Sequence, residues 1–98
     1  MLHIVNKSPM VNSALENCLN AAASGDILLI EDAVYAATTG STFEPKLREA
    51  LGSFKVYVLQ PDLDARGMSD KLIEGVSAVD YGGFVDLAVT NNSCQSWL

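Results

Sequence analysis

Short apolar runs alternate along the chain with segments whose apolar residues recur at helical spacing. The runs at 2–6, 26–31, 54–60 and 76–81 are rich in β-branched and aliphatic residues and predict four strands. The closing segment 94–98 predicts a fifth strand at a sheet edge. The second run is almost continuously apolar, which is typical of a strand covered on both faces.

The segment between the first two strands predicts an amphipathic helix. Ser13 and Glu16 have the spacing of a capping box, in which each side chain accepts a hydrogen bond from a free backbone N–H. Gly25 stands where helices often end in a left-handed residue. One buried face is predicted by the i, i+3, i+4, i+7 rhythm of Leu15, Cys18, Leu19 and Ala22.

Four further helical segments are predicted from their polar starts and apolar spacing: 33–37, 45–51, 62–67 and 83–89. Asp32 is placed to cap the first of them. In the last, Phe84, Val85 and Ala88 are expected on one side.

The alternation of strands and helices predicts parallel strands joined by right-handed helical crossovers. The fold class is therefore α/β: a single three-layer domain over residues 1–98, with a small, mostly parallel sheet of about five strands flanked by helices. A chain of this length builds one hydrophobic core and not two.

Composition narrows the classes of function. Hydrophobic residues make up 49% of the chain and charged residues 18%, which excludes a disordered protein. No apolar run approaches the roughly 20 residues of a membrane span, and the first residues lack a signal-peptide pattern. We therefore expect a cytoplasmic protein with no membrane association. The net charge of −6 opposes direct nucleic-acid binding, which needs a basic patch.

Few residues offer metal, disulfide or cofactor chemistry. Cys18 and Cys94 lie 76 positions apart (94 − 18) and do not suggest a disulfide framework. His3 is the only histidine, and no C-x-x-C pattern occurs, so we expect no metal site. His3 is expected in the core or at an interface. Neither a G-x-G-x-x-G nor a P-loop spacing occurs, and we expect no cofactor.

Sites in α/β sheets collect beyond the carboxyl ends of the strands. Glu31 and Asp32 are candidates there for acid–base chemistry, although a helix-capping role explains Asp32 more simply. Arg66 is a candidate for anion binding, with a surface ion pair as the simpler interpretation. These residues belong to two of the four polar stretches expected at this edge: 6–9, 31–35, 59–67 and 80–83.

Cys18 has two interpretations. Its helical position places it on the buried face, where a thiol acts as a small hydrophobic group and burial raises its pKa. The alternative is a sulfur nucleophile. Cys94 lies in a polar tail and is expected to be more exposed, with nothing beside it to activate its thiol. Trp97 is expected to dock the tail or to contact a partner.

Five segments in order along the whole chain resemble the TusB/DsrH family: MLHIVNKSP (1–9), GDILLIEDAVYAA (25–37), VYVLQPDLDARG (56–67), VDYGGFVDL (79–87) and QSWL (95–98). The resemblance implies a DsrE/DsrF/DsrH-like fold. It also implies a sulfur-relay subunit that joins TusC/DsrF-like and TusD/DsrE-like sister subunits in a dimer of heterotrimers. In the Tus branch, such a complex passes persulfide sulfur toward 2-thiouridine at the tRNA wobble position.

The resemblance also bears on the thiols. In the TusD/DsrE line, a cysteine lies at the end of the third strand, shortly before an Arg-Gly pair. This chain has Leu59 at about that place, and leucine cannot carry a persulfide. DsrH-type members are similar to this chain in having a cysteine in the first helix, like Cys18, whereas some TusB members have none. The resemblance therefore implies an accessory subunit without independent catalysis, with Cys18 as a candidate accessory persulfide site.

Three alternatives stay open. The chain is a DsrH-like subunit of a DsrEFH complex in dissimilatory sulfur oxidation, or a homo-oligomeric binding module without sulfur transfer; when its partners are absent, it is a candidate homodimer. It is otherwise an independent sulfurtransferase that uses Cys18. We favour the tRNA branch because it is the more widespread fate of the family.

Overall fold

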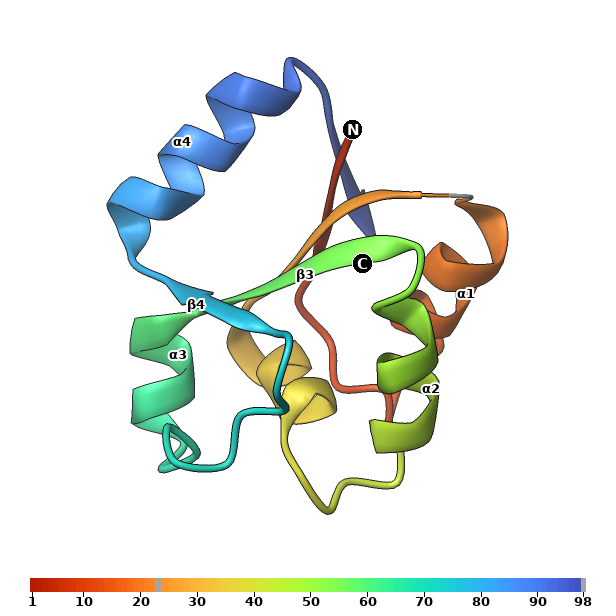
Figure 1. Cartoon of the computed structure of the whole chain (residues 1–98), viewed down its shortest axis with the longest axis vertical. Helices are drawn as coiled ribbons and strands as arrows, with labels where there is room; N and C mark the ends of the chain where they lie inside the picture. The colour runs from red at the N-terminus through yellow and green to blue at the C-terminus, as the bar shows by residue number, and fades with distance from the viewer. Residues whose placement is uncertain (23, 98) are drawn as a thin grey trace.

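Five parallel strands form the centre of the protein, as the computed structural model shows (Figure 1). The structure describes residues 1–22 and 24–97. Along the chain the elements are β1 (Leu2–Val5), α1 (Ala14–Ala21), β2 (Gly25–Leu29), the 3-10 helix η1 (Glu31–Ala37), α2 (Glu44–Ala50), β3 (Phe54–Leu59), α3 (Gln60–Ala65), β4 (Ser77–Val79), α4 (Tyr81–Asn91) and β5 (Cys94–Trp97).

The strand order is β4-β3-β2-β1-β5, and every pair is parallel. The chain moves outward from β1 to β4, and α4 then returns it to β5 beside β1. This return places the last strand at a sheet edge, as predicted. The α/β class with a single parallel sheet is confirmed.

Helices cover both faces of the sheet and make three layers. Val5, Ile27 and Val58 point to the face covered by α1, α2 and η1, and they form the main core with those helices. Leu28 and Asp26 point to the other face, because neighbouring strand residues alternate in direction. There the Asn91 side chain of α4 donates a hydrogen bond to Asp26 Oδ2 at 3.0 Å, which places α4 over that face.

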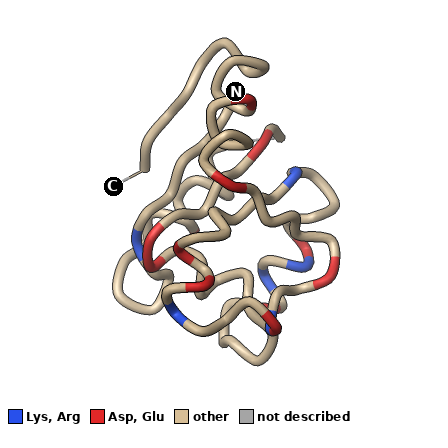
Figure 2. The backbone as a smooth tube through the Cα atoms, turned by 90° about the vertical axis from the view of Figure 1, so that its left-hand side faces the viewer, with Lys and Arg blue, Asp and Glu red and all other residues tan. Residues whose placement is uncertain are grey.

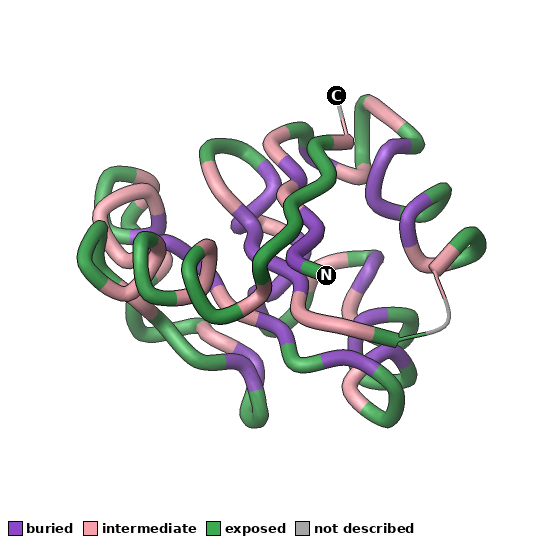
Figure 3. The backbone as a smooth tube through the Cα atoms, turned by 90° about the horizontal axis from the view of Figure 1, so that it is seen from above, coloured by how far each residue is buried: buried purple, intermediate pink, exposed green. Residues whose placement is uncertain are grey.

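The central strand β2 is buried on both faces, as its apolar run predicted. Ile27, Leu28 and Leu29 are all fully buried. Figure 3 shows the buried backbone concentrated along the middle strands, with exposed residues toward the outer helices. Each fully buried aliphatic side chain of this kind contributes about 1.5–3 kcal/mol to folding.

Helix α1 lies where it was predicted, but its ends are built differently. The prediction of a capping box is wrong, because Ser13 makes no capping bond. Instead, the Ala14 N–H donates to Asn12 Oδ1 at 2.7 Å. Glu16 instead pairs with Lys46 Nζ at 2.6 Å. Gly25 does not end the helix but begins β2 with φ +135°, and a Cβ there would lie 2.9 Å from the Met1 carbonyl oxygen. Glycine is therefore required by this close backbone approach.

Helix α4 is longer than the predicted segment 83–89. Asp80 Oδ1 accepts a hydrogen bond from the Gly83 N–H at 2.8 Å and so starts the helix earlier. Asn92, with φ +62°, ends it in the left-handed region. The prediction for Val85 is wrong, since this side chain is 59% exposed, whereas Phe84 and Ala88 are half-buried.

Basic and acidic residues are interspersed along the backbone in Figure 2. No residue after Lys71 is basic. Within residues 1–22 and 24–97, no helix has the length and apolar character needed to cross a bilayer.

Candidate functional site

Two of the four polar stretches expected at the carboxyl edge of the sheet meet there. Arg66, just after α3, donates from Nε to Asp32 Oδ1 at 2.9 Å, and its Nη2 lies 2.8 Å from the same oxygen. Arg66 Nη1 also donates to the Asp62 carbonyl at 3.0 Å. The ion-pair interpretation of Arg66 is confirmed. The capping role of Asp32 is wrong, because no side chain caps η1.

Glu31 takes a strained backbone conformation at the same edge. Its φ of +51° lies in the left-handed region, which costs a non-glycine residue about 1–2 kcal/mol. Asp62 Oδ2 accepts the Glu31 N–H at 2.7 Å and holds this turn. The sequence reasoning missed Asp62, whose only signal is a carboxylate following Pro61 at the start of α3.

These contacts brace the turn after β2 against the helix after β3. Asp32 and Asp62 are both engaged by groups of the protein, and Glu31 is exposed to solvent. No cysteine, serine or histidine joins them in the contacts described. The arrangement therefore acts as a structural clamp at the sheet edge rather than as an acid–base pair around a nucleophile.

The other two polar stretches serve local structure. Asp80 caps α4, and Ser8 Oγ accepts the Met10 N–H at 3.2 Å in the turn after β1. Asn6 Oδ1 is buried and has no hydrogen-bond partner within residues 1–22 and 24–97. In that part of the chain, no group of three or more His, Cys, Asp or Glu side chains is arranged to hold a metal.

Cys18 is fully buried on the inner face of α1. Burial raises the pKa of its thiol to about 11, because the charged thiolate loses its hydration there. At neutral pH the thiol is therefore almost entirely protonated and a poor nucleophile. Its surroundings fit the packing interpretation, and its sulfur-carrying role stays a prediction.

Cys94 is free and exposed on the edge strand β5, as expected. The same strand carries Trp97, whose indole Nε1–H donates to His3 Nδ1 at 3.2 Å. His3 is only 5% exposed, and burial, followed by the charge of the chain's amino terminus, lowers its pKa. Trp97 therefore docks the tail, and His3 is a buried residue, as predicted.

Leu59 ends β3 at the place where the resemblance located a carrier cysteine in the sister subunits. Its side chain is 4% exposed. It pairs with Val79 in the register of β3 and β4. Both its chemistry and its burial exclude sulfur binding at this position.

The sequence profile of the family described as "DsrH like protein" matches residues 7–94. The chain is also 36% identical over 98 residues to Protein TusB of Shigella flexneri, covering 99% of this chain and 100% of that protein. Protein TusB of Escherichia coli O81 (strain ED1a) has the same identity and coverage. The chain belongs to the TusB/DsrH family.

Two solved structures show that the TusB/DsrH chain shares its fold with other proteins. The ychN protein from E. coli matches with a TM-score of 0.82 and 22% identity, over 97% of each chain. A protein of unknown function, MTH1491 from Methanobacterium thermoautotrophicum, matches with a TM-score of 0.67 and 21% identity, over 97% of this chain and 95% of that one. At such identities the likeness concerns the fold alone.

Proposed function

We propose that this TusB/DsrH protein is an accessory subunit of a sulfur-relay complex that passes persulfide sulfur toward 2-thiouridine at the tRNA wobble position. The partners are TusC/DsrF-like and TusD/DsrE-like chains in a cytoplasmic dimer of heterotrimers. Membership in the family over the full length of the chain supports the relay role. The similarity to proteins named TusB supports the tRNA branch.

The buried Leu59 carries the accessory part of this proposal. A persulfide carrier needs a thiol that solvent and donor can reach, and which ionises readily. Leu59 has neither sulfur nor exposure at the end of β3. The two thiols of the chain do not replace it, since Cys18 is buried with a raised pKa and Cys94 has no activating neighbour in the contacts described.

Assembly gives the first test. The chain is co-expressed with TusC-like and TusD-like chains from the same genome, and the mixture is separated by size exclusion. We expect the three chains to elute together as one species larger than any of them alone. Elution of this chain by itself contradicts the relay role, and its elution as a homo-oligomer favours the binding module.

Sulfur loading gives the second test. The assembled complex is incubated with a persulfide donor, and each subunit is weighed by mass spectrometry. We expect the gain of one sulfur atom on the TusD-like chain. On this chain, an accessory site at Cys18 predicts a gain that Cys18→Ser abolishes and Cys94→Ser preserves. A gain unaffected by Cys18→Ser removes Cys18 from the relay.

The dissimilatory branch is the second candidate, because the matching family profile is that of DsrH-like proteins and the chain has a cysteine in its first helix. The genes beside this one separate the two branches. Genes for sulfite-reductase subunits favour sulfur oxidation, and a thiolation defect in tRNA from a deletion strain favours the tRNA branch.

A further inference from the structure

Helix α4 presents an apolar stripe to solvent. Tyr81, Val85 and Val89 lie one turn apart and are 61%, 59% and 70% exposed. They stand on the outward side of the helix, which also carries Gly82, Asp86 and Thr90. A stripe of three large apolar side chains on one helix face is typical of an interaction site, whereas scattered single residues are not.

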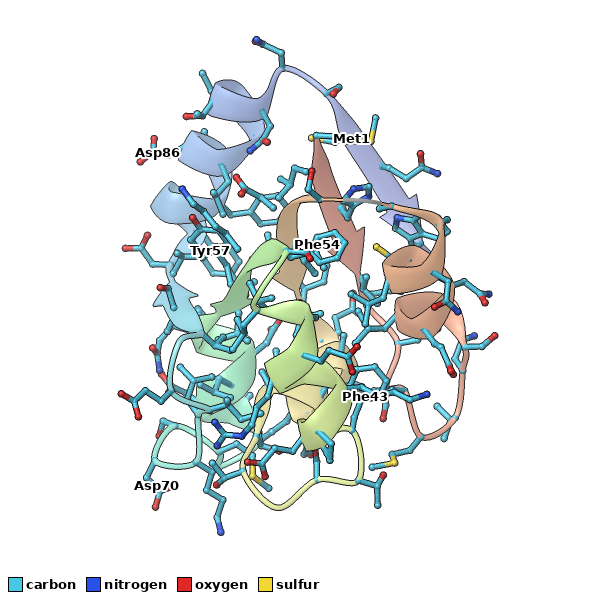
Figure 4. All side chains as sticks on the ribbon, turned by 45° about the vertical axis from the view of Figure 1, so that its right-hand side comes forward. Met1, Phe43, Phe54, Tyr57, Asp70 and Asp86 are labelled. Carbon is cyan, nitrogen blue, oxygen red and sulfur yellow. The ribbon has the colours of Figure 1, made fainter. Side chains whose placement is uncertain are left out.

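The inner side of α4 is also incompletely covered. None of its residues is buried, whereas α1 buries three residues although it is shorter. Figure 1 shows α4 alone on its side of the sheet, and the half-buried Tyr57 lies on the same face in Figure 4. Helix α4 therefore leaves apolar surface uncovered on its outward side and incompletely covered on its inner side.

The charged residues on and near α4 indicate which kind of partner can bind its outward face. Asp86 is the only charged residue between Tyr81 and Trp97, and its side chain points away from the molecule (Figure 4). Three acidic and no basic residues follow Lys71. An anionic nucleic acid or membrane surface is repelled by such a face, because it offers no Lys or Arg. A second copy would add its own Asp86 and a further −6 of charge.

We propose that the outward face of α4 docks another subunit of the relay complex through an apolar patch bordered by Lys or Arg. Tyr81, Val85 and Val89 supply the apolar contact, and Asp86 pairs with the basic border. The inference rests on the proposed function, since it takes the partner from that complex. Depletion of charge and the presence of tyrosine are both features of interface centres.

Val85→Glu tests the apolar contact, and Val11→Glu is its matched control. Val11 is 80% exposed and lies outside α4, so both variants place a carboxylate on an exposed valine. Binding of each variant to the co-expressed TusC-like and TusD-like chains is measured by titration, after circular dichroism has compared their folding. We expect Val85→Glu to weaken binding by about tenfold or more, and Val11→Glu to leave it unchanged.

Asp86→Lys tests the basic border. We expect it to weaken binding to the sister chains, mainly by slowing association. At high salt, its association rate should equal that of the wild type, because the charges are screened. If the stripe instead docks a second copy, the wild-type chain alone is a dimer that Val85→Glu dissociates, and this result overturns the proposal.

The remaining outcomes distinguish failure of the α4 interface from failure of the proposed relay role. Assembly of the wild type together with full binding by Val85→Glu overturns the α4 interface and leaves the relay role intact. Failure of the wild type to assemble with the sister chains overturns both. If Val85→Glu does not fold, binding by Tyr81→Ser replaces it as the test. Hydrogen exchange of residues 81–91 is then also compared with and without the sister chains, and absence of protection in the complex overturns the interface.

Discussion

Cys18 and Cys94 carry the same thiol in opposite surroundings. The Cys18 thiol has no solvent contact and its pKa is raised to about 11, whereas Cys94 is exposed. We expect an aromatic disulfide reagent at pH 8 to modify one thiol per native chain and two per unfolded chain. Cys94→Ser is expected to abolish the fast reaction. Fast loss of both thiols in the native protein would show that α1 opens readily.

The surroundings of Cys18 also set the effect of replacing it. Cys18→Ser puts a hydroxyl among apolar side chains, and we expect it to reduce the free energy of unfolding by about 1–3 kcal/mol. Cys18→Ala leaves only a small cavity and should cost less. Urea unfolding of the two variants compares them. A smaller loss for serine than for alanine would mean that the site is polar.

His3 makes stability depend on pH. Its pKa in the folded chain is lowered from 6.5 by burial and by the amino terminus, so the unfolded chain binds more protons just below pH 6.5. Stability therefore rises with pH up to about 6.5 and falls as the pH drops below it. We expect His3→Gln to flatten the melting temperature between pH 5 and 6.5. Equal pH dependence in variant and wild type would contradict this.

At the scale of elements, the turn after β2 stores strain at Glu31. Glu31→Gly relieves about 1–2 kcal/mol of left-handed strain but adds about 0.5–1 kcal/mol of backbone entropy cost. We therefore expect it to be neutral or to stabilise the protein by up to about 1.5 kcal/mol. Glu49→Gly, a control inside α2, should destabilise by about 1 kcal/mol. Chemical unfolding of both variants decides, and equal destabilisation would mean that no strain is present at Glu31.

The positions of the strands along the chain could be predicted because buried strands leave short apolar runs in the sequence. The partners of polar side chains could not. Glu16 was assigned to a cap three residues away, but its partner Lys46 is 30 residues distant. Asp32 was likewise expected to cap a helix, but it binds Arg66, which is 34 residues further along the chain. Val85 was expected on the same side of its helix as Phe84 and Ala88, but it is exposed and they are half-buried, because spacing alone does not show which apolar residues face the sheet.

The sequence predicted the position of the candidate site better than its role. The rule that polar groups gather at the carboxyl edge of the sheet identified Asp32 and Arg66 as candidates, and in the structure they form an ion pair. Asp62 was missed because its role depends on a turn 31 residues earlier. Local spacing carries no information about such contacts.

At the scale of the whole molecule, the net charge of −6 governs long-range encounters. We expect the isolated chain not to bind labelled tRNA in a gel-shift assay, even at low salt, where basic proteins bind most tightly. Any tRNA binding should therefore require another component of the relay. Salt-sensitive binding by the chain alone would contradict this prediction.

The pairing of β1 with β5 has a consequence for synthesis. Of the five strands, β1 leaves the ribosome first, and one of its two neighbours, β5, leaves last, with Leu2 opposite Cys94. Until β5 emerges, one side of β1 has no pairing partner, and the loop that must close contains the other three strands. Folding of the sheet therefore cannot finish before β5 has emerged, and until then the nascent chain carries an open, aggregation-prone edge.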